Sequence, residues 1–220
     1  MPLHHGLFGS THFRLQTQHA FIAGHGEWLV VWPALQCPCL LEDRQFDPTC
    51  LSCHGTGRLY LDALQYTHRF LLVREHSSRH YEEPGTVIPG TIQMSIPPGV
   101  QLAERDKVRR VGIKEVFNDE TLERGGDETL RFSGGVELLV VADRERIYQS
   151  GRDYVLTTPN VVSWVPGGQA PPFMASYSVR YAAHPDYLIT PDSPRSRLEH
   201  DVAQSQVVTA MRLDYLQEGL

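Results

Sequence analysis

The feature that most constrains the fold of this chain is a group of four cysteines between residues 37 and 53. They are the only cysteines in the chain, and their spacing is C-x-C, ten residues, then C-x-x-C. Structural zinc takes four such ligands at tetrahedral corners, and two close pairs joined by a short loop supply them. The second pair continues as "CLSCHGTG", where glycines permit turns that point N–H groups at thiolate sulfur. We therefore predict a zinc knuckle whose ligands are Cys37, Cys39, Cys50 and Cys53.

Other arrangements of these cysteines remain open from the sequence. Two disulfides require an oxidising setting, which a particle outside the cell would meet. A redox-active C-x-x-C pair requires a helix N-terminus to lower the thiol pKa, and the glycine-rich flank disfavours a helix. Unliganded core thiols are a third alternative, and His54 is placed to replace one thiolate. A closed four-ligand site leaves no position for a substrate, so the predicted Zn²⁺ is structural and stabilises a loop with few apolar residues.

Composition and charge limit the classes of function. With 41% hydrophobic and 21% charged residues among 220, the chain is typical of a globular protein that buries a core. No apolar run reaches the roughly 18 residues of a membrane helix, so we expect no membrane partner. The first ten residues show no secretory signal, which favours the cytoplasm. A net charge of −6 disfavours wrapping of nucleic acid.

Two local charge clusters each allow two interpretations. The basic group Lys107, Arg109 and Arg110 fits a solvated strand edge better than a DNA contact. An acidic group between residues 119 and 128 fits a solvated loop better than a site for a hard cation, and it consists of Asp119, Glu120, Glu123, Asp127 and Glu128.

Hydrophobic patterning predicts a mainly β protein. Residues 11–25 indicate a short N-terminal helix that Gly24 ends, and residues 27–32 indicate a strand. Short alternating runs separated by Gly and Pro follow within 90–99, 106–126, 128–156 and 160–189. Such strands are typical of a β-sandwich or barrel, here with the zinc knuckle as a small insertion. Residues 57–76 fit either a long hairpin or a helix between strands.

The chain divides into three predicted segments. Residues 1–60 hold the N-terminal helix, a strand and the knuckle, and residues 61–189 form the β-rich core domain. Residues 190–220 begin with a polar linker interrupted by proline and continue as an extended C-terminal tail. The tail fits a strand and a short helix that dock on their own domain or on a neighbouring subunit.

The sequence lacks the motifs that would indicate an enzyme. The sequence contains no H-E-x-x-H, no G-x-S-x-G and no phosphate-binding G-x-x-x-x-G-K. A metal-dependent enzyme would have to use histidines near the start, His4, His5 or His12, and is the least favoured hypothesis. We expect no catalytic activity.

Two resemblances to known families add to this interpretation. "CLSCHGTG" resembles half of a zinc-binding repeat of the J-domain co-chaperones, but the chain has one half-repeat and no H-P-D triplet. Residues 146–189 resemble the β-domains of tailed-phage virion proteins, with a G-x-D-Y strand, a V-x-W strand, a Gly/Pro loop and Y-S-V-x-Y. The matching residues are Gly151, Asp153, Tyr154, Trp164, Gly167, Gly168, Pro171, Tyr177, Ser178, Val179 and Tyr181.

Two further stretches resemble neck proteins of tailed phages: "ERDKVRR" (104–110) and "FIAGHGEWLVVWPALQCPC" (21–39). The resemblance implies a structural component of the virion, assembled in the host cytoplasm, that forms a homomeric ring at the neck or head–tail connector. Its implied partners are the portal or connector, the tail terminator or tube, and packaged DNA as an additional contact. The alternatives are a tail or baseplate protein and a zinc-stabilised protein-binding module.

Overall fold

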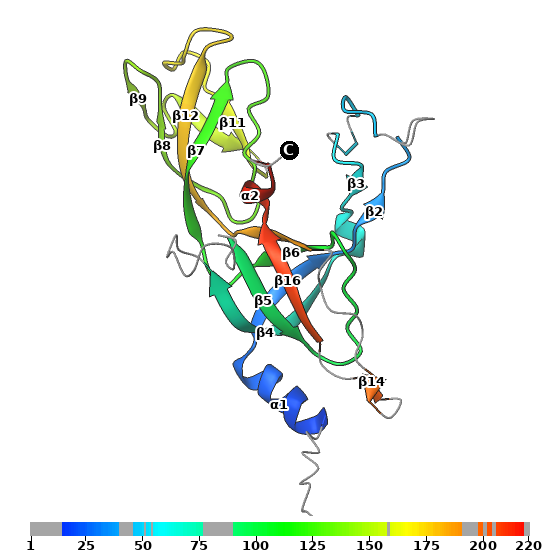
Figure 1. Ribbon diagram of the computed structural model, residues 1–220. Coiled ribbons are helices and arrows are strands. Elements are labelled where there is room, and N and C mark those ends of the chain that lie inside the picture. The colour runs from blue at the N-terminus through cyan, green and yellow to red at the C-terminus, as the bar shows by residue number, and fades with distance from the viewer. Residues whose placement is uncertain are drawn as a thin grey trace, which may run out of the picture.

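The computed structural model describes residues 15–39, 46–50, 52–53, 55–76, 90–157, 159–190, 198–199, 202–203 and 206–217. Strands dominate these residues, and they form a closed barrel, a lobe (residues 115–183) and an arm (residues 35–59). The lobe and the arm project from one end of the barrel, and a short helix lies at the other end (Figure 1). The predicted fold class, mainly β with a barrel, a short N-terminal helix and a cysteine insertion, is confirmed.

The barrel consists of six antiparallel strands and draws on all three predicted segments of the chain. In order around the barrel they are β1 (Glu27–Trp32), β4 (Tyr66–His76), β5 (Thr91–Ile96), β16 (Gln206–Arg212), β13 (Asp186–Ile189) and β6 (Lys107–Arg110). Side chains alternate along each strand, so every second residue points into the barrel. The buried interior is formed by Leu29, Val31, Phe70, Ile92, Met94, Ile96, Val108, Tyr187, Ile189, Val208 and Ala210.

The lobe is inserted between β6 and β13 and has a core of its own. A four-stranded sheet runs β7 (Glu115–Glu123), β12 (Ser176–Ala183), β8 (Glu137–Ala142) and β9 (Ile147–Tyr148), and a second ribbon pairs β10 (Tyr154–Thr157) with β11 (Val161–Trp164). The alternation predicted along β12 is confirmed, because Tyr177, Val179 and Tyr181 are buried and Ser176, Ser178 and Arg180 are exposed. Phe117 stacks on Phe132 with ring centroids 4.2 Å apart.

Arg109 fixes the lobe to the barrel. Its guanidinium donates to both carboxylate oxygens of Asp186, at 2.6 and 2.8 Å, and to Ser133 Oγ at 3.0 Å. It also lies 4.9 Å from the centroid of the Trp32 ring, which favours a cation. Gly134 is required beside it, since a Cβ there would come within 2.7 Å of the arginine side chain.

Arg212 makes a second connection between the same two units. Arg212 is the last residue of β16, and it forms ion pairs with Glu115 at the start of β7 and with Asp214. Asp214 belongs to α2 (Leu213–Gln217), so one arginine joins the barrel, the lobe and this helix. The predicted strand and short helix of the tail are confirmed by β16 and α2.

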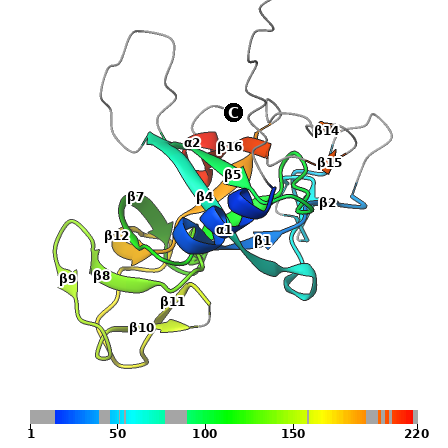
Figure 2. The same cartoon turned by 90° about the horizontal axis from the view of Figure 1, so that it is seen from below.

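The N-terminal helix α1 (Leu15–His25) lies across the far end of the barrel, against β4 (Figure 2). Ile22 of this helix is buried, while Phe21 is half exposed. The predicted helix is confirmed from Leu15 onward, but it continues through Gly24 to His25; residues 11–14 lie outside the described part. None of the helices in the described ranges has the length and apolar character needed to cross a membrane.

Residues 57–76 adopt neither of the two predicted arrangements. They form β3 (Arg58–Leu59), a 3₁₀ turn (Asp62–Leu64) and then the long strand β4. The physical reason is that β4 pairs with β1 on one side and with β5 on the other, and these partners are distant in sequence. Pairing with distant strands overrides the local pattern, which was ambiguous between helix and strand.

Asp153 is a buried carboxylate in a turn of the lobe, and its side chain is 1% exposed. The Arg152 guanidinium, followed by the N–H groups of Gln149 and Gln169, holds the pKa of Asp153 well below its usual range. A lowered folded pKa contributes stability that is present above the unfolded value of about 3.9 and is lost as the pH falls below it.

We therefore expect Asp153→Asn to lower the free energy of unfolding at pH 7, with the gap to the wild type narrowing below about pH 4. Urea unfolding at a series of pH values measures both effects. Glu104→Gln, at a surface carboxylate with a 54% exposed side chain, is the control and should change little. A gap that stays constant across the pH range would contradict the role assigned to Asp153.

Candidate metal centre

A short β-ribbon brings the two cysteine pairs together in the arm. β2 (Leu35–Gln36) pairs antiparallel with β3, with Leu35 opposite Leu59. The ribbon continues one step further, because the Cys37 N–H donates to the carbonyl of Gly57 at 2.9 Å. Cys37 and Cys39 follow β2, and Cys50 and Cys53 precede β3. The pairing of these two strands therefore brings the two cysteine pairs together.

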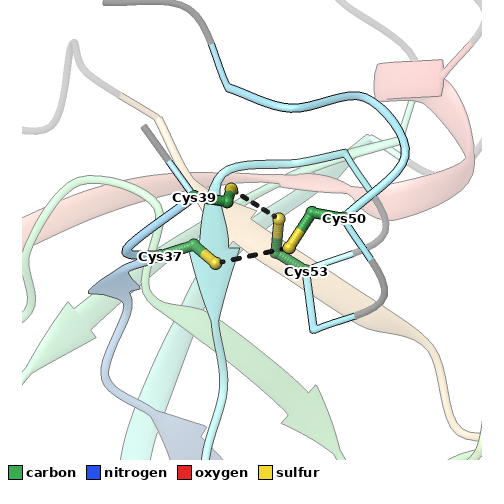
Figure 3. Close-up of side chains that lie close together, drawn as sticks. All are labelled: Cys37, Cys39, Cys50 and Cys53. Carbon is green, nitrogen blue, oxygen red and sulfur yellow. Dashed lines mark hydrogen bonds between the residues drawn. The ribbon is translucent and has the colours of Figure 1, made fainter. Parts of the chain in front are cut away.

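The four sulfur atoms converge (Figure 3). The Sγ atoms of Cys37 and Cys50 are 3.8 Å apart, those of Cys39 and Cys53 are 3.5 Å apart, and all four lie within 4.8 Å of one another. Four sulfurs at the Zn–S distance of about 2.3 Å from a shared tetrahedral centre are about 3.8 Å apart. The sulfurs predicted as ligands thus have the spacing of a tetrahedral thiolate site, and the cluster could hold a metal ion.

Two of the alternatives, a pair of disulfides and a redox-active pair, do not match this geometry. All four cysteines are free, and a disulfide requires a sulfur–sulfur distance of about 2.05 Å. The second pair lies in a turn, so Cys50 and Cys53 lack the helix N-terminus expected of a redox-active pair. His54 lies outside the described residues.

Polar contacts shape the turn that carries the second pair. The Asp47 carboxylate accepts from the N–H and the hydroxyl of Thr49, and the Cys50 N–H donates to the carbonyl of Asp47 at 3.1 Å. After the pair, both the N–H and the hydroxyl of Thr56 donate to the carbonyl of Cys53. These bonds satisfy the backbone of a segment that is too short to form regular secondary structure.

The electrostatic environment differs among the thiols. The N–H groups of Cys53 and Ser52 point at the sulfur of Cys50 and lower its pKa to about 7. Burial, together with the neighbouring thiols of Cys37 and Cys53, raises the pKa of Cys39 to about 12. N–H groups aimed at sulfur stabilise a thiolate, which is the form that binds a metal.

Glycine at position 57 is needed for the arm to close. Gly57 has φ of +69°, and a Cβ there would lie 2.4 Å from the ring of Phe46. The Phe46 ring, which belongs to the segment between the two cysteine pairs, therefore packs directly on Gly57. This contact explains the glycine that the sequence places after the second pair.

Gly57→Ala is expected to weaken metal binding about 10–100-fold, because the displaced Phe46 ring moves the supports of the ligands. Gly99→Ala is the matched control: Gly99 also has a positive φ, of +87°, but no atom lies within 4 Å of its Cβ position. Both variants lose about 1–2 kcal/mol of backbone stability, so only the clash distinguishes them. Competition with a chelating indicator measures the affinity, and equal affinities in the two variants would contradict this account.

The basic cluster is not a solvated strand edge, which corrects the prediction. β6 lies between β1 and β13, Arg110 is 3% exposed and its guanidinium lies 3.1 Å from Glu27. Arg109 is bound to Asp186, and Lys107 lies 4.6 Å from the centroid of the Trp32 ring, where burial lowers its pKa. Because these three side chains contact other residues of the protein, the cluster does not support the expected contact with packaged DNA.

Two members of the acidic cluster are also structural, so the prediction of a solvated loop is wrong for them. Glu120 accepts from Tyr181 at 2.6 Å and from the Arg131 N–H at 2.7 Å. Glu128 accepts from the Trp164 ring N–H at 2.7 Å and from Tyr177 at 2.9 Å. Sequence reasoning missed these roles, since their tyrosine and tryptophan donors are distant in the chain.

The comparisons with known proteins do not add a relative. No protein-family model matches the chain, and no curated protein matches it. The cysteine centre is the best-defined candidate site among the described residues. His4, His5 and His12, considered for a metal-dependent enzyme, lie outside them.

Proposed function

We propose that the protein is a zinc-stabilised structural component of a tailed-phage virion that forms a homomeric ring at the neck or head–tail connector. The observation that carries the proposal is that the residues resembling virion β-domains meet in one unit, the lobe. Tyr154, Tyr177 and Tyr181 belong to its core, Asp153 accepts the N–H groups of Gln149 and Gln169 in one of its turns, and Trp164 contacts three tyrosine rings edge-on. The matching residues therefore lie within one folded unit.

The cysteine centre supports a structural role. Four thiolates complete the tetrahedral coordination of Zn²⁺ and leave no open position for water or substrate. The described residues of the arm belong to neither of the two hydrophobic cores. Zinc would supply the folding energy that the arm lacks, as it does in small zinc domains.

The zinc part of the proposal is tested by elemental analysis of the purified chain, with thiol titration before and after chelation. We expect about one zinc per chain and four thiols that become reactive only after chelation. Four reactive thiols without chelation, or none at all, would refute it. A stoichiometric metal other than zinc would preserve the centre but change its identity.

The assembly part is tested by light scattering after size exclusion and by electron microscopy of negatively stained particles. We expect closed rings that associate with portal or tail-terminator proteins of the phage that encodes the chain. A protein that remains monomeric at high concentration and binds neither partner would refute the ring. Rings that bind only tail-tube or baseplate proteins would move the protein to the tail.

A second candidate function, a zinc-stabilised protein-binding module, is favoured by exposed leucines at the base of the arm. Leu35, Leu61 and Leu64 are 37%, 45% and 44% exposed. Affinity capture from host cells with the wild type and with a variant carrying serine at these three positions tests it. A host protein that binds the wild type in a one-to-one complex and is lost with the variant would support this candidate over the ring.

A further inference from the structure

Two exposed apolar side chains, Phe173 and Met174, form a knob at the tip of the lobe. They are 72% and 58% exposed. The backbone beneath them is fixed by Arg124, whose carbonyl accepts from the Met174 N–H at 2.9 Å and whose N–H donates to the carbonyl of Ala175 at 3.1 Å. The Arg124 guanidinium also binds the carbonyl of Pro171. The knob is therefore presented by a rigid loop.

The local conformation of the knob is costly. Met174 has φ of +63°, which a residue with a side chain rarely adopts, and Phe173 lies over Gly125, where a Cβ would come within 2.1 Å of the ring. Strained residues that expose large apolar groups cluster at binding sites. Aromatic and methionine side chains are also enriched where proteins contact one another.

A pocket of about 320 Å³ lies at the other end of the molecule, between α1 and the barrel. Its apolar walls are Ile22, Ala23, Trp28 and Pro97. Trp28 is half exposed, and the Arg69 guanidinium lies 4.9 Å from the centroid of its ring. The exposed part of the ring remains open to a ligand, and methionine sulfur packs favourably at the edge of such rings. A volume of this size is at the lower limit for ligand pockets and fits one or two side chains.

The knob and the pocket have complementary charge. The turn that holds the knob carries Glu123 and Asp127, and the cation between them, Arg124, is bound through its guanidinium to the carbonyl of Pro171. The pocket is lined by His19, His68 and Arg69 and by no acidic residue in the described part of the chain. Opposite charges around an apolar contact orient the two surfaces and select against wrong partners.

The loop before β12 lies at the tip of the lobe, and α1 lies at the opposite end of the barrel (Figure 1), so Phe173 and Met174 cannot reach the pocket of their own chain. We infer that Phe173 and Met174 of one copy occupy the pocket beside α1 of the next copy. Such a contact joins two different surfaces head to tail, and a head-to-tail contact closes into a ring when its rotation permits. The inference rests on the proposed ring and assigns one of its contacts.

Two variants, each defective in one surface, test this inference. Phe173→Ser removes the knob, and Ala23→Trp fills the pocket. Each is expected to raise the concentration of half-maximal assembly by at least about 30-fold, as for a central interface residue. Ile147→Ser is the matched control, because Ile147 is 71% exposed on the same lobe, and it should assemble like the wild type.

Mixing the two defective variants gives the sharper result. The Phe173→Ser chain retains its pocket and the Ala23→Trp chain retains its knob, so the mixture should yield one-to-one heterodimers in analytical ultracentrifugation. Each variant alone should remain monomeric. Labelling one variant with ¹⁵N allows native mass spectrometry to confirm one chain of each kind.

The outcomes separate this inference from the proposed ring. Rings of the Phe173→Ser variant at the wild-type concentration would overturn the knob-and-pocket contact and leave the ring intact. Defective variants that remain monomeric when mixed would show that the knob and the pocket do not meet. A wild type that never associates would overturn both proposals.

Discussion

Replacing Cys53 with serine is expected to remove the metal from the arm and to unfold the arm, while the barrel and the lobe stay folded. Binding of structural zinc contributes about 10–16 kcal/mol in small zinc domains, far more than the arm's few buried contacts supply. Cys37 and Cys53 are the buried cysteines of the cluster, and Cys39 and Cys50 are partly exposed. Loss of one buried ligand leaves three sulfurs, an open coordination position and a ribbon with two residues in each strand.

Hydrogen exchange followed by mass spectrometry measures this effect region by region. The amides of Cys37, Cys50 and Thr56, which donate to backbone carbonyls, should exchange rapidly in the variant, and the barrel strands should remain protected. Ser52→Ala is the matched control, since Ser52 lies in the same turn and is exposed. A Cys53→Ser protein that keeps one metal per chain and its protected arm would refute the four-cysteine centre.

Replacing Asp186 with alanine is expected to lower the free energy of unfolding by about 3–5 kcal/mol, because it leaves a buried arginine without its counter-charge. The side chains of Arg109 and Asp186 are 12% and 4% exposed. The effect should spread to the lobe, since the same guanidinium holds Ser133. Denaturant unfolding followed by tryptophan fluorescence measures the loss.

A double variant separates the cost of an unpaired charge from the net contribution of the pair. Arg109→Met with Asp186→Leu replaces both charges with apolar groups and should regain most of the lost stability. Glu137→Ala breaks the exposed pair with Lys114, at 3.7 Å, and should cost less than about 1 kcal/mol. Equal losses in the Asp186→Ala and Glu137→Ala variants would contradict the role of the buried pair.

The parts of the structure that the sequence predicted well are local. The N-terminal helix, the strand over residues 27–32 and the alternating strand at Tyr177 each have a pattern that repeats within a few residues. The end of the helix was predicted wrongly, since it continues through Gly24 to His25. The cysteine cluster was predictable for the same reason: both pairs and the glycines that follow the second pair lie in one short stretch. Ligand chemistry and turn chemistry then leave few arrangements.

The parts that could not be predicted depend on pairing between distant residues. β1 pairs with β6 and β5 pairs with β16, and nothing in either strand identifies its partner. The roles of Arg109, Glu120 and Glu128 follow from contacts with distant residues, since a charged residue looks the same in the sequence whether solvent or a buried partner faces it. Sequence reasoning therefore placed these residues in solvent by default.

The order of strands around the barrel also has a consequence for synthesis of the protein. β16 lies between β5 and β13, so the barrel cannot close until residues 206–212 have left the ribosome. All strands of the lobe, by contrast, have been made once residue 183 has emerged. We expect the lobe to fold first on the nascent chain. Until β16 is made, the strands of the unfinished barrel have unpaired edges, which a chaperone would recognise.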